Sequence, residues 1–224
     1  MTFSLIGRCA KTGHFGMVIS SSSPAVAARC VHLRPGTGIA ASQNVTDPAL
    51  GPLLLDAMEG GLDAEQAVAS VVGQRPHIQY RQLMALGHSG KAAIFSGSQV
   101  LGCWAEALGD NCASAGNLLA SEKVPQAMVD AFETAEGELG VRLMRALRAG
   151  LDAGGEAGPV HSAGMKMSGE LSWPVADLRI DWSLDCPIAA LEAAWAVYHP
   201  QMLDYVQRAI DPTQARSYGV PGDE

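Results

Sequence analysis

The second residue of the chain, Thr2, combines a side chain and a position that together could do chemistry. Methionine is ordinarily removed from a new protein when the next residue is small, and threonine is small enough. Removal of Met1 would leave a hydroxyl and a free α-amine on one residue. Because an α-amine titrates near ~7.7–8.0, it can accept the hydroxyl proton at neutral pH while the oxygen attacks a carbonyl carbon. Thr2 is therefore a candidate nucleophile that supplies its own base.

Three consecutive serines, Ser21, Ser22 and Ser23, end the second predicted strand. The first predicted strand carries Thr2 and pairs with the second in a hairpin, because a polar, glycine-containing turn joins them. Hydroxyl groups at this strand end could hydrogen-bond the α-amine of Thr2, or they could be polar residues where a strand reaches water. Both interpretations remain open, and the three serines are candidate substrate-binding residues.

Gln43, Asn44 and Asp47 lie where a predicted strand gives way to a helix, a place from which side chains commonly reach a cleft. The amide groups of Gln43 and Asn44 each offer a donor and an acceptor, so both are candidates for holding substrate amide groups. Asp47 precedes a proline and is first of all a predicted helix N-cap, with a role in the site as the alternative.

Asn117 and His161 are two further candidates. Asn117 ends a predicted strand just before a helix, where its amide or a nearby backbone N–H could stabilise an oxyanion. The alternative is that Asn117 caps the helix. His161 begins one of the last strands and could bind substrate or serve as an acid or base, although a single strand histidine is more often structural.

The chain shows no pattern that binds a metal or a cofactor. It lacks a phosphate loop, a Gly-x-Gly-x-x-Gly turn, a His-Glu-x-x-His helix and a Gly-x-Ser-x-Gly elbow. The remaining histidines have no metal-ligand spacing; they are His14, His32, His77, His88 and His199. We expect neither a metal nor a cofactor.

The order of predicted elements indicates how these residues are positioned. Strands are predicted at 2–8, 15–22, 25–33, 38–43, 79–86, 92–96, 111–115, 160–167 and 175–181, and helices at 47–58, 63–72, 120–132, 139–151 and 187–205. Strands, two helices, strands, two helices, strands and a helix suit two packed sheets with helices outside. The predicted fold is α+β, a four-layer αββα sandwich of two stacked, mainly antiparallel sheets flanked by helices.

Length and composition favour one globular domain. The 224 residues are 48% hydrophobic, and neither a repeat nor a polar linker divides them. We expect a single domain over residues 1–210 and a loosely held C-terminal tail over 211–224, which contains two prolines and two glycines after the last helix.

Net charge and cysteine content limit which kinds of partner and which cellular compartment we expect. The formal net charge is −8 and no basic stripe is present, so nucleic acid is not expected as a partner. No apolar run is long enough to cross a membrane. Five scattered cysteines without a Cys-x-x-Cys pair, and no signal-peptide layout, favour the cytoplasm. We expect a homo-oligomer, with Trp182, Trp195 and Tyr198 as candidate interface aromatics.

A set of short motifs in a fixed order resembles a known family. The motifs are Thr2-Phe3-Ser4-Leu5-Ile6, Thr12-Gly13-His14-Phe15-Gly16, Ser21-Ser22-Ser23-Pro24-Ala25-Val26, Ser42-Gln43-Asn44-Val45-Thr46-Asp47-Pro48, Leu50-Gly51-Pro52 and Gly116-Asn117-Leu118-Leu119. From Thr2 to about Leu191 the chain resembles a bacterial and archaeal family of unknown function that is grouped with the N-terminal-nucleophile (Ntn) hydrolases. The resemblance implies an αββα sandwich with the N-terminal strand at the mouth of the cleft between the sheets. Many members have lysine at the position of Ser22, so a lysine-assisted mechanism does not carry over.

The residues and the resemblance together predict a hydrolase. We expect an Ntn-type amidohydrolase that cleaves a linear C–N amide bond in a small amide or peptide-like substrate, with Thr2 as nucleophile and Asn117 as oxyanion donor. The alternative is a non-catalytic protein of the same fold that binds a small ligand or serves as a scaffold. Ser22 in place of lysine favours the alternative, as would retention of Met1.

Overall fold

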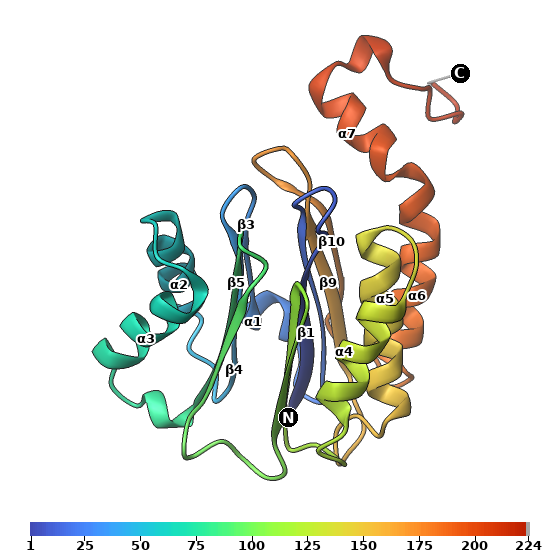
Figure 1. Ribbon diagram of the computed structural model, residues 1–224. Helices are drawn as coiled ribbons and strands as arrows, with labels where there is room; N and C mark the ends of the chain where they lie inside the picture. Colours follow the sequence, from blue (N-terminus) through green and yellow to red (C-terminus); the bar gives the residue numbers. More distant parts are fainter. Residues whose placement is uncertain (223–224) are drawn as a thin grey trace.

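Antiparallel strands form two sheets that stack face to face in the computed structural model, which describes residues 1–222 (Figure 1). The larger sheet has the order β10-β9-β2-β1-β8-β7, with β1 (Thr2–Arg8), β2 (Phe15–Ser21), β7 (Ala105–Gly109), β8 (Cys112–Asn117), β9 (Ser162–Ser168) and β10 (Pro174–Ile180). The smaller sheet has the order β3-β4-β5-β6, with β3 (Val31–Arg34), β4 (Gly38–Asn44), β5 (Arg81–Gly87) and β6 (Ala92–Ser96). Strand β1 is therefore an inner strand of the larger sheet.

Helices cover the outer face of each sheet (Figure 1). The smaller sheet is covered by α2 (Leu50–Glu59) and α3 (Ala64–Gln74), and the larger sheet by α4 (Val124–Thr134), α5 (Leu139–Asp152) and α6 (Pro187–Tyr198). The remaining helical segments are α1 (Val26–Cys30), α7 (Met202–Ile210) and the 3-10 turns Ile78–Tyr80, His199–Gln201 and Pro212–Gln214. These layers confirm the predicted αββα sandwich.

Three apolar cores fill the spaces between the four layers. One lies between the larger sheet and its helices and contains Phe3 and Leu5. A second lies between the two sheets and contains Ile6. The third lies between the smaller sheet and its two helices. Successive side chains of a strand point to opposite faces, so Phe3 and Leu5 face the helices while Thr2 and Ile6 face the other sheet.

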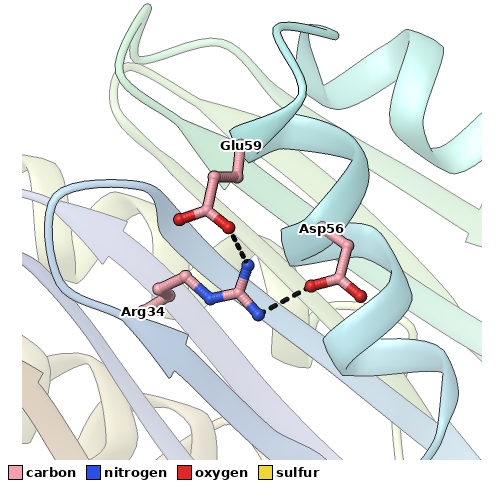
Figure 2. A network of polar contacts seen from close by, with 3 residues as sticks. All are labelled: Arg34, Asp56 and Glu59. Atoms are coloured by element: carbon pink, nitrogen blue, oxygen red, sulfur yellow. Dashed lines mark hydrogen bonds and ion pairs between the residues drawn. The ribbon is translucent and has the colours of Figure 1, made fainter.

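Polar contacts at the surface hold helix α2 on the β3–β4 hairpin. Arg34 at the end of β3 reaches two carboxylates of α2, Asp56 and Glu59, each at 2.7 Å (Figure 2). Exposed ion pairs of this kind contribute about 0–1 kcal/mol each, so they fix the position of the hairpin more than they stabilise the fold. A capping box begins helix α3, because the side chains of Asp63 and Gln66 each accept a hydrogen bond from the other residue's backbone N–H.

Two sequence-based predictions of local structure were wrong, and one strand was not predicted. Residues 25–33 were expected to be a strand, but Val26–Cys30 form helix α1, which contacts both sheets. Strand β7 was not expected at all. Asp47 was expected to cap α2, yet the helix begins at Leu50 and its N-cap is Ala49, without a side-chain bond. Asp47 instead accepts a hydrogen bond from the backbone N–H of Ala49, at 3.0 Å, in the turn before the helix.

The C-terminal part differs in one further respect from expectation. A single closing helix was predicted from residue 187 to Tyr205, but a 3-10 turn that contains Pro200 separates α6 from α7. Trp195, one of the three expected interface aromatics, is only 7% exposed and packs in the core beside α5. Trp182 is 53% exposed, and Tyr198 is partly buried with its hydroxyl donating to the carbonyl of Val175 at 2.6 Å.

Candidate active site at the start of strand β1

Three candidate residues lie side by side on neighbouring strands. Thr2 at the start of β1 pairs in register with Asn117 at the end of β8, and the register of β1 with β2 places Ser21 on the other side. The Thr2 and Ser21 hydroxyl oxygens are 3.5 Å apart. All three residues are buried, with Thr2 4% exposed and the other two fully enclosed. The structure therefore brings together the candidate nucleophile, one serine and the candidate oxyanion donor.

The Met1 carbonyl occupies the hydroxyls of this cluster. Both Thr2 and Ser21 donate a hydrogen bond to the main-chain oxygen of Met1. The Met1 side chain extends toward Gly158, where an added Cβ would lie 3.7 Å from its methyl carbon. While Met1 is present, the nitrogen of Thr2 is a peptide nitrogen that has no free lone pair to act as a base. With Met1 attached, the site therefore has no free α-amine on Thr2.

A chain of hydroxyl groups connects Ser21 to a positive charge. The oxygens of Ser21 and Ser23 are 2.8 Å apart, and the backbone N–H of Ser23 donates to the Ser21 oxygen at 3.1 Å. The guanidinium of Arg29, in helix α1, donates to the Ser23 oxygen at 2.9 Å. Hydrogen bonds from a charged donor are stronger than neutral ones, so Arg29 polarises the serine hydroxyls. Arg29 was not a sequence-based candidate, because helix α1 was not predicted.

A buried carboxylate, Glu156, reaches the same strand end. Its two oxygens accept the backbone N–H of Ser22 at 3.0 and 3.1 Å, and the residue is 5% exposed. Burial raises the pKa of Glu156 to about 7, although the amino-terminal charge, the bonds to Ser22 and the neighbouring His161 act in the opposite direction. The sequence signal was weak: one carboxyl in the run Gly154-Gly155-Glu156-Ala157-Gly158.

His161 lies beside this carboxylate. Its backbone N–H donates to the carbonyl of Ser21 at 2.8 Å, and its Nδ1 is 2.8 Å from the carbonyl oxygen of Ser183. The imidazole stacks on the indole of Trp182 with the ring centres 4.5 Å apart. The ring is therefore held in one orientation next to the cluster, and its role in binding substrate stays a prediction.

An amide network lies beneath the cluster, between the two sheets. Gln43 accepts from the hydroxyl of Ser4 at 2.7 Å and donates to Gln82 at 2.9 Å. The Asn117 amide nitrogen also donates to Gln82, at 3.2 Å, whereas its oxygen is buried without a hydrogen-bond partner within residues 1–222. Gln43 therefore acts through Gln82 to fix the amide of Asn117, and its expected contact with substrate stays untested.

Asn44, the last residue of β4, is held by two main-chain groups. It adopts a left-handed backbone, with φ of 73°. Its side chain donates to the carbonyl of Tyr80 at 2.7 Å and accepts from the N–H of Leu101 at 3.3 Å. Asn44 and Asp47 thus bond neighbouring main-chain groups, and within residues 1–222 neither side chain forms a hydrogen bond with Thr2. Their expected part in substrate binding stays a prediction.

The described residues contain no group of three or more His, Cys, Asp or Glu side chains that could hold a metal ion. No helix in the described part of the chain is long and apolar enough to cross a membrane. The chemistry available at the start of β1 consists of hydroxyls, amides, one guanidinium, one buried carboxyl and the imidazole of His161.

Two stacked antiparallel sheets between helical layers define the class as an α+β fold, a four-layer αββα sandwich. The chain belongs to the family of unknown function DUF1028, whose model matches residues 2–191. A crystal structure of the protein SPO2555 from Silicibacter pomeroyi, described with the same family model, is 30% identical with a TM-score of 0.82 and covers 88% of each chain.

Two other solved structures resemble the fold of this chain less closely. Eukaryotic HslV from Trypanosoma brucei is 9% identical, with a TM-score of 0.47 and coverage of 74% of this chain and 98% of its own. Anbu (ancestral β-subunit) from Yersinia bercovieri is 10% identical, with a TM-score of 0.38 and coverage of 91% and 97%. No curated protein matches the chain.

Proposed function

We propose that this chain is an Ntn-type amidohydrolase that cleaves a linear C–N amide bond, with Thr2 as the nucleophile after removal of Met1. The observation that carries the proposal is the setting of the Thr2 hydroxyl. Thr2 begins an inner strand and faces the second sheet. Its hydroxyl lies 3.5 Å from the hydroxyl of Ser21, which is linked through Ser23 to Arg29.

The proposed reaction has two halves. The Thr2 hydroxyl attacks the substrate carbonyl while the α-amine accepts its proton, and the amine then gives the proton to the leaving nitrogen. This breaks the C–N bond and leaves an ester on Thr2. Water then attacks the ester, again with the amine as base, and releases a carboxylic acid and the free hydroxyl. The remaining N–H hydrogen of the Asn117 amide, or a backbone N–H nearby, is the proposed oxyanion donor; loss of one such donor costs roughly 10²–10³ in turnover.

A test begins with the mass of protein made without an N-terminal tag, which should correspond to the chain without Met1. That protein should hydrolyse a member of a library of small amides and short peptides. Thr2→Ala should abolish hydrolysis and leave the fold intact, whereas Thr2→Ser should keep part of the activity because serine supplies the same groups. Thr12→Ala is the matched control, because Thr12 is exposed in the turn at the far end of the β1–β2 hairpin.

The alternative function is a non-catalytic protein that binds a small ligand. If Met1 is retained in the mature protein, the hydroxyls of Thr2 and Ser21 both donate to its carbonyl, and no free amine is available. Full activity in Thr2→Ala would show that another residue is the nucleophile. Quantitative retention of Met1 in the mature protein would instead rule out Thr2 as the nucleophile and leave ligand binding as the function. In that case, calorimetry with the same amides should detect binding without turnover.

A further inference from the structure

A short segment of chain passes the end of the larger sheet where β1 begins. The N–H of Ala120 donates to the carbonyl of Gly155 at 3.1 Å, and the N–H of Ala157 donates to the carbonyl of Leu118 at 3.0 Å. These bonds fasten residues 155–157 to the chain that leaves β8. The Glu156 side chain then reaches the N–H of Ser22, which follows β2. Because β1 lies between β8 and β2, residues 155–157 connect the ends of the two strands on either side of Thr2.

The carboxyl of Glu156 has few charged neighbours. The positive charge that acts on it is that of the chain's amino terminus, and the titratable ring of His161 faces it from the start of β9. A cavity of about 270 Å³ adjoins it and is lined also by Asp185 and Cys186 from the loop before α6. None of the ion pairs among the described residues includes Glu156.

A buried carboxyl without a lysine or arginine partner is costly, because an ionised group loses its water and gains no compensating charge. Such a residue is retained more readily where it has a specific task. The group on which Glu156 can act at this position is the amino terminus, whose charge acts on the Glu156 carboxyl while Met1 is present. Removal of Met1 would move that amine onto Thr2, directly beside Ser21.

We propose that Glu156 is the positioning residue of the site, which orients the freed α-amine of Thr2 and holds the proton that this amine takes from the hydroxyl. The inference rests on the proposed function in one respect: the amine must be that of Thr2. Ser22 contributes through its backbone N–H, which fixes the carboxyl, rather than through its side chain.

The proton balance is simple. The Thr2 hydroxyl gives its proton to the amine as the carbon–oxygen bond forms, and the resulting ammonium shares a proton with the Glu156 carboxylate. The proton returns through the amine to the leaving nitrogen when the C–N bond breaks. A relay of this kind works best when donor and acceptor hold a proton with similar strength. The raised pKa of Glu156, about 7, is close to the ~7.7–8.0 of an ordinary α-amine.

The test needs no substrate. Full-length protein is released from an N-terminal fusion by a protease that cuts directly before Thr2, so that the amine is free whatever happens to Met1 naturally. The pKa of that amine is then measured from the pH dependence of its acetylation by acetic anhydride, read by mass spectrometry. Glu156→Gln should lower the amine pKa by about one unit, because a nearby negative charge that favours the ammonium is lost. Glu156→Asp should restore part of the difference.

Glu170→Gln is the matched control, because Glu170 is exposed in the β9–β10 turn. An unchanged amine pKa in a folded Glu156→Gln protein would overturn the inference. In the hydrolysis assay the same variant should lose about 10²-fold in kcat with little change in KM. The two proposals fail separately: a shifted amine pKa without hydrolysis contradicts only the proposed function, and hydrolysis with an unshifted amine contradicts only the role of Glu156.

Discussion

The carboxyl of Glu156 couples the stability of the protein to pH. Burial raises its pKa to about 7 in the folded chain, whereas an exposed glutamate titrates near 4.5. Between these two values the folded state binds the proton that the unfolded state has released. The free energy of unfolding that this group contributes therefore falls as the pH rises through the window from about 4.5 to 7. Above that window the ionised carboxyl destabilises the fold.

Glu156→Gln should remove this dependence. Glutamine has nearly the same shape, can still accept a bond from the N–H of Ser22, and carries no charge. We expect the variant to be more stable than the parent at pH 8 and of similar stability at pH 4.5, as measured by urea denaturation across that range. A variant that is less stable than the parent at pH 8 would show that ionised Glu156 supports the fold.

The sequence identified the residues of the cluster that have a positional or motif signal. Thr2 follows from its place after Met1, and Ser21 and Asn117 from strand ends that the hairpin and the family motif bring together. Arg29 and Glu156 could not be found in this way. Their contacts join side chains to loop groups, in one case 134 positions apart, and no local pattern encodes such a pairing.

At the scale of elements, periodicity predicted most of the long strands and helices, but it missed the break between α6 and α7 and failed for two short elements. Strand β7 has one buried residue, Ala107, so it lacks an alternating apolar pattern. Helix α1 was mistaken for a strand because Val26, Ala27 and Cys30 are apolar and flanked by turn residues. Its helical form depends on packing against β9, where an added Cβ at Gly164 would lie 2.4 Å from the Cβ of Ala27.

Gly164→Ala should therefore force α1 away from β9. Overpacking of this kind typically costs about 1–3 kcal/mol in the free energy of unfolding. Gly73→Ala is the matched control, since Gly73 is an exposed residue of α3 with no atom within 4 Å of an added Cβ. It should stabilise the protein by about 0.5–1 kcal/mol through the higher helix propensity of alanine. Equal stability of the two variants in urea denaturation would contradict this account of α1.

At the scale of the whole molecule, the segment after α6 adds little to the sandwich. Figure 1 shows α7 beyond the end of the sandwich, and only Met202 of this helix is buried. The guanidinium of Arg208 lies 3.8 Å from the ring centre of Tyr218, a surface contact that ties the tail to α7. The division into a domain over 1–210 and a tail over 211–224 stays a prediction, as does the homo-oligomer, and residues 223 and 224 of that tail lie outside the described part of the chain.

Deletion of residues 211–224 should change the free energy of unfolding by less than about 0.5 kcal/mol, because surface contacts contribute little. Trp195→Ala provides the contrast: loss of a buried aromatic from the core beside α5 should cost about 3–5 kcal/mol. Urea denaturation of both variants measures the difference. A large loss of stability in the deletion would mean that the tail belongs to the domain.

The place of β1 inside the larger sheet has a consequence for the time course of synthesis. Its partner β8 and the segment 155–157 are made long after Thr2, so the first strand has to wait for them before it can be enclosed. At about 5–20 residues per second, a ribosome needs roughly 8 to 30 s to reach residue 157. Any enzyme that removes Met1 would have to act within that interval, since afterwards the carbonyl it must reach accepts hydrogen bonds from two buried hydroxyls. The rate of translation would then help to set the fraction of molecules that carry a free threonine.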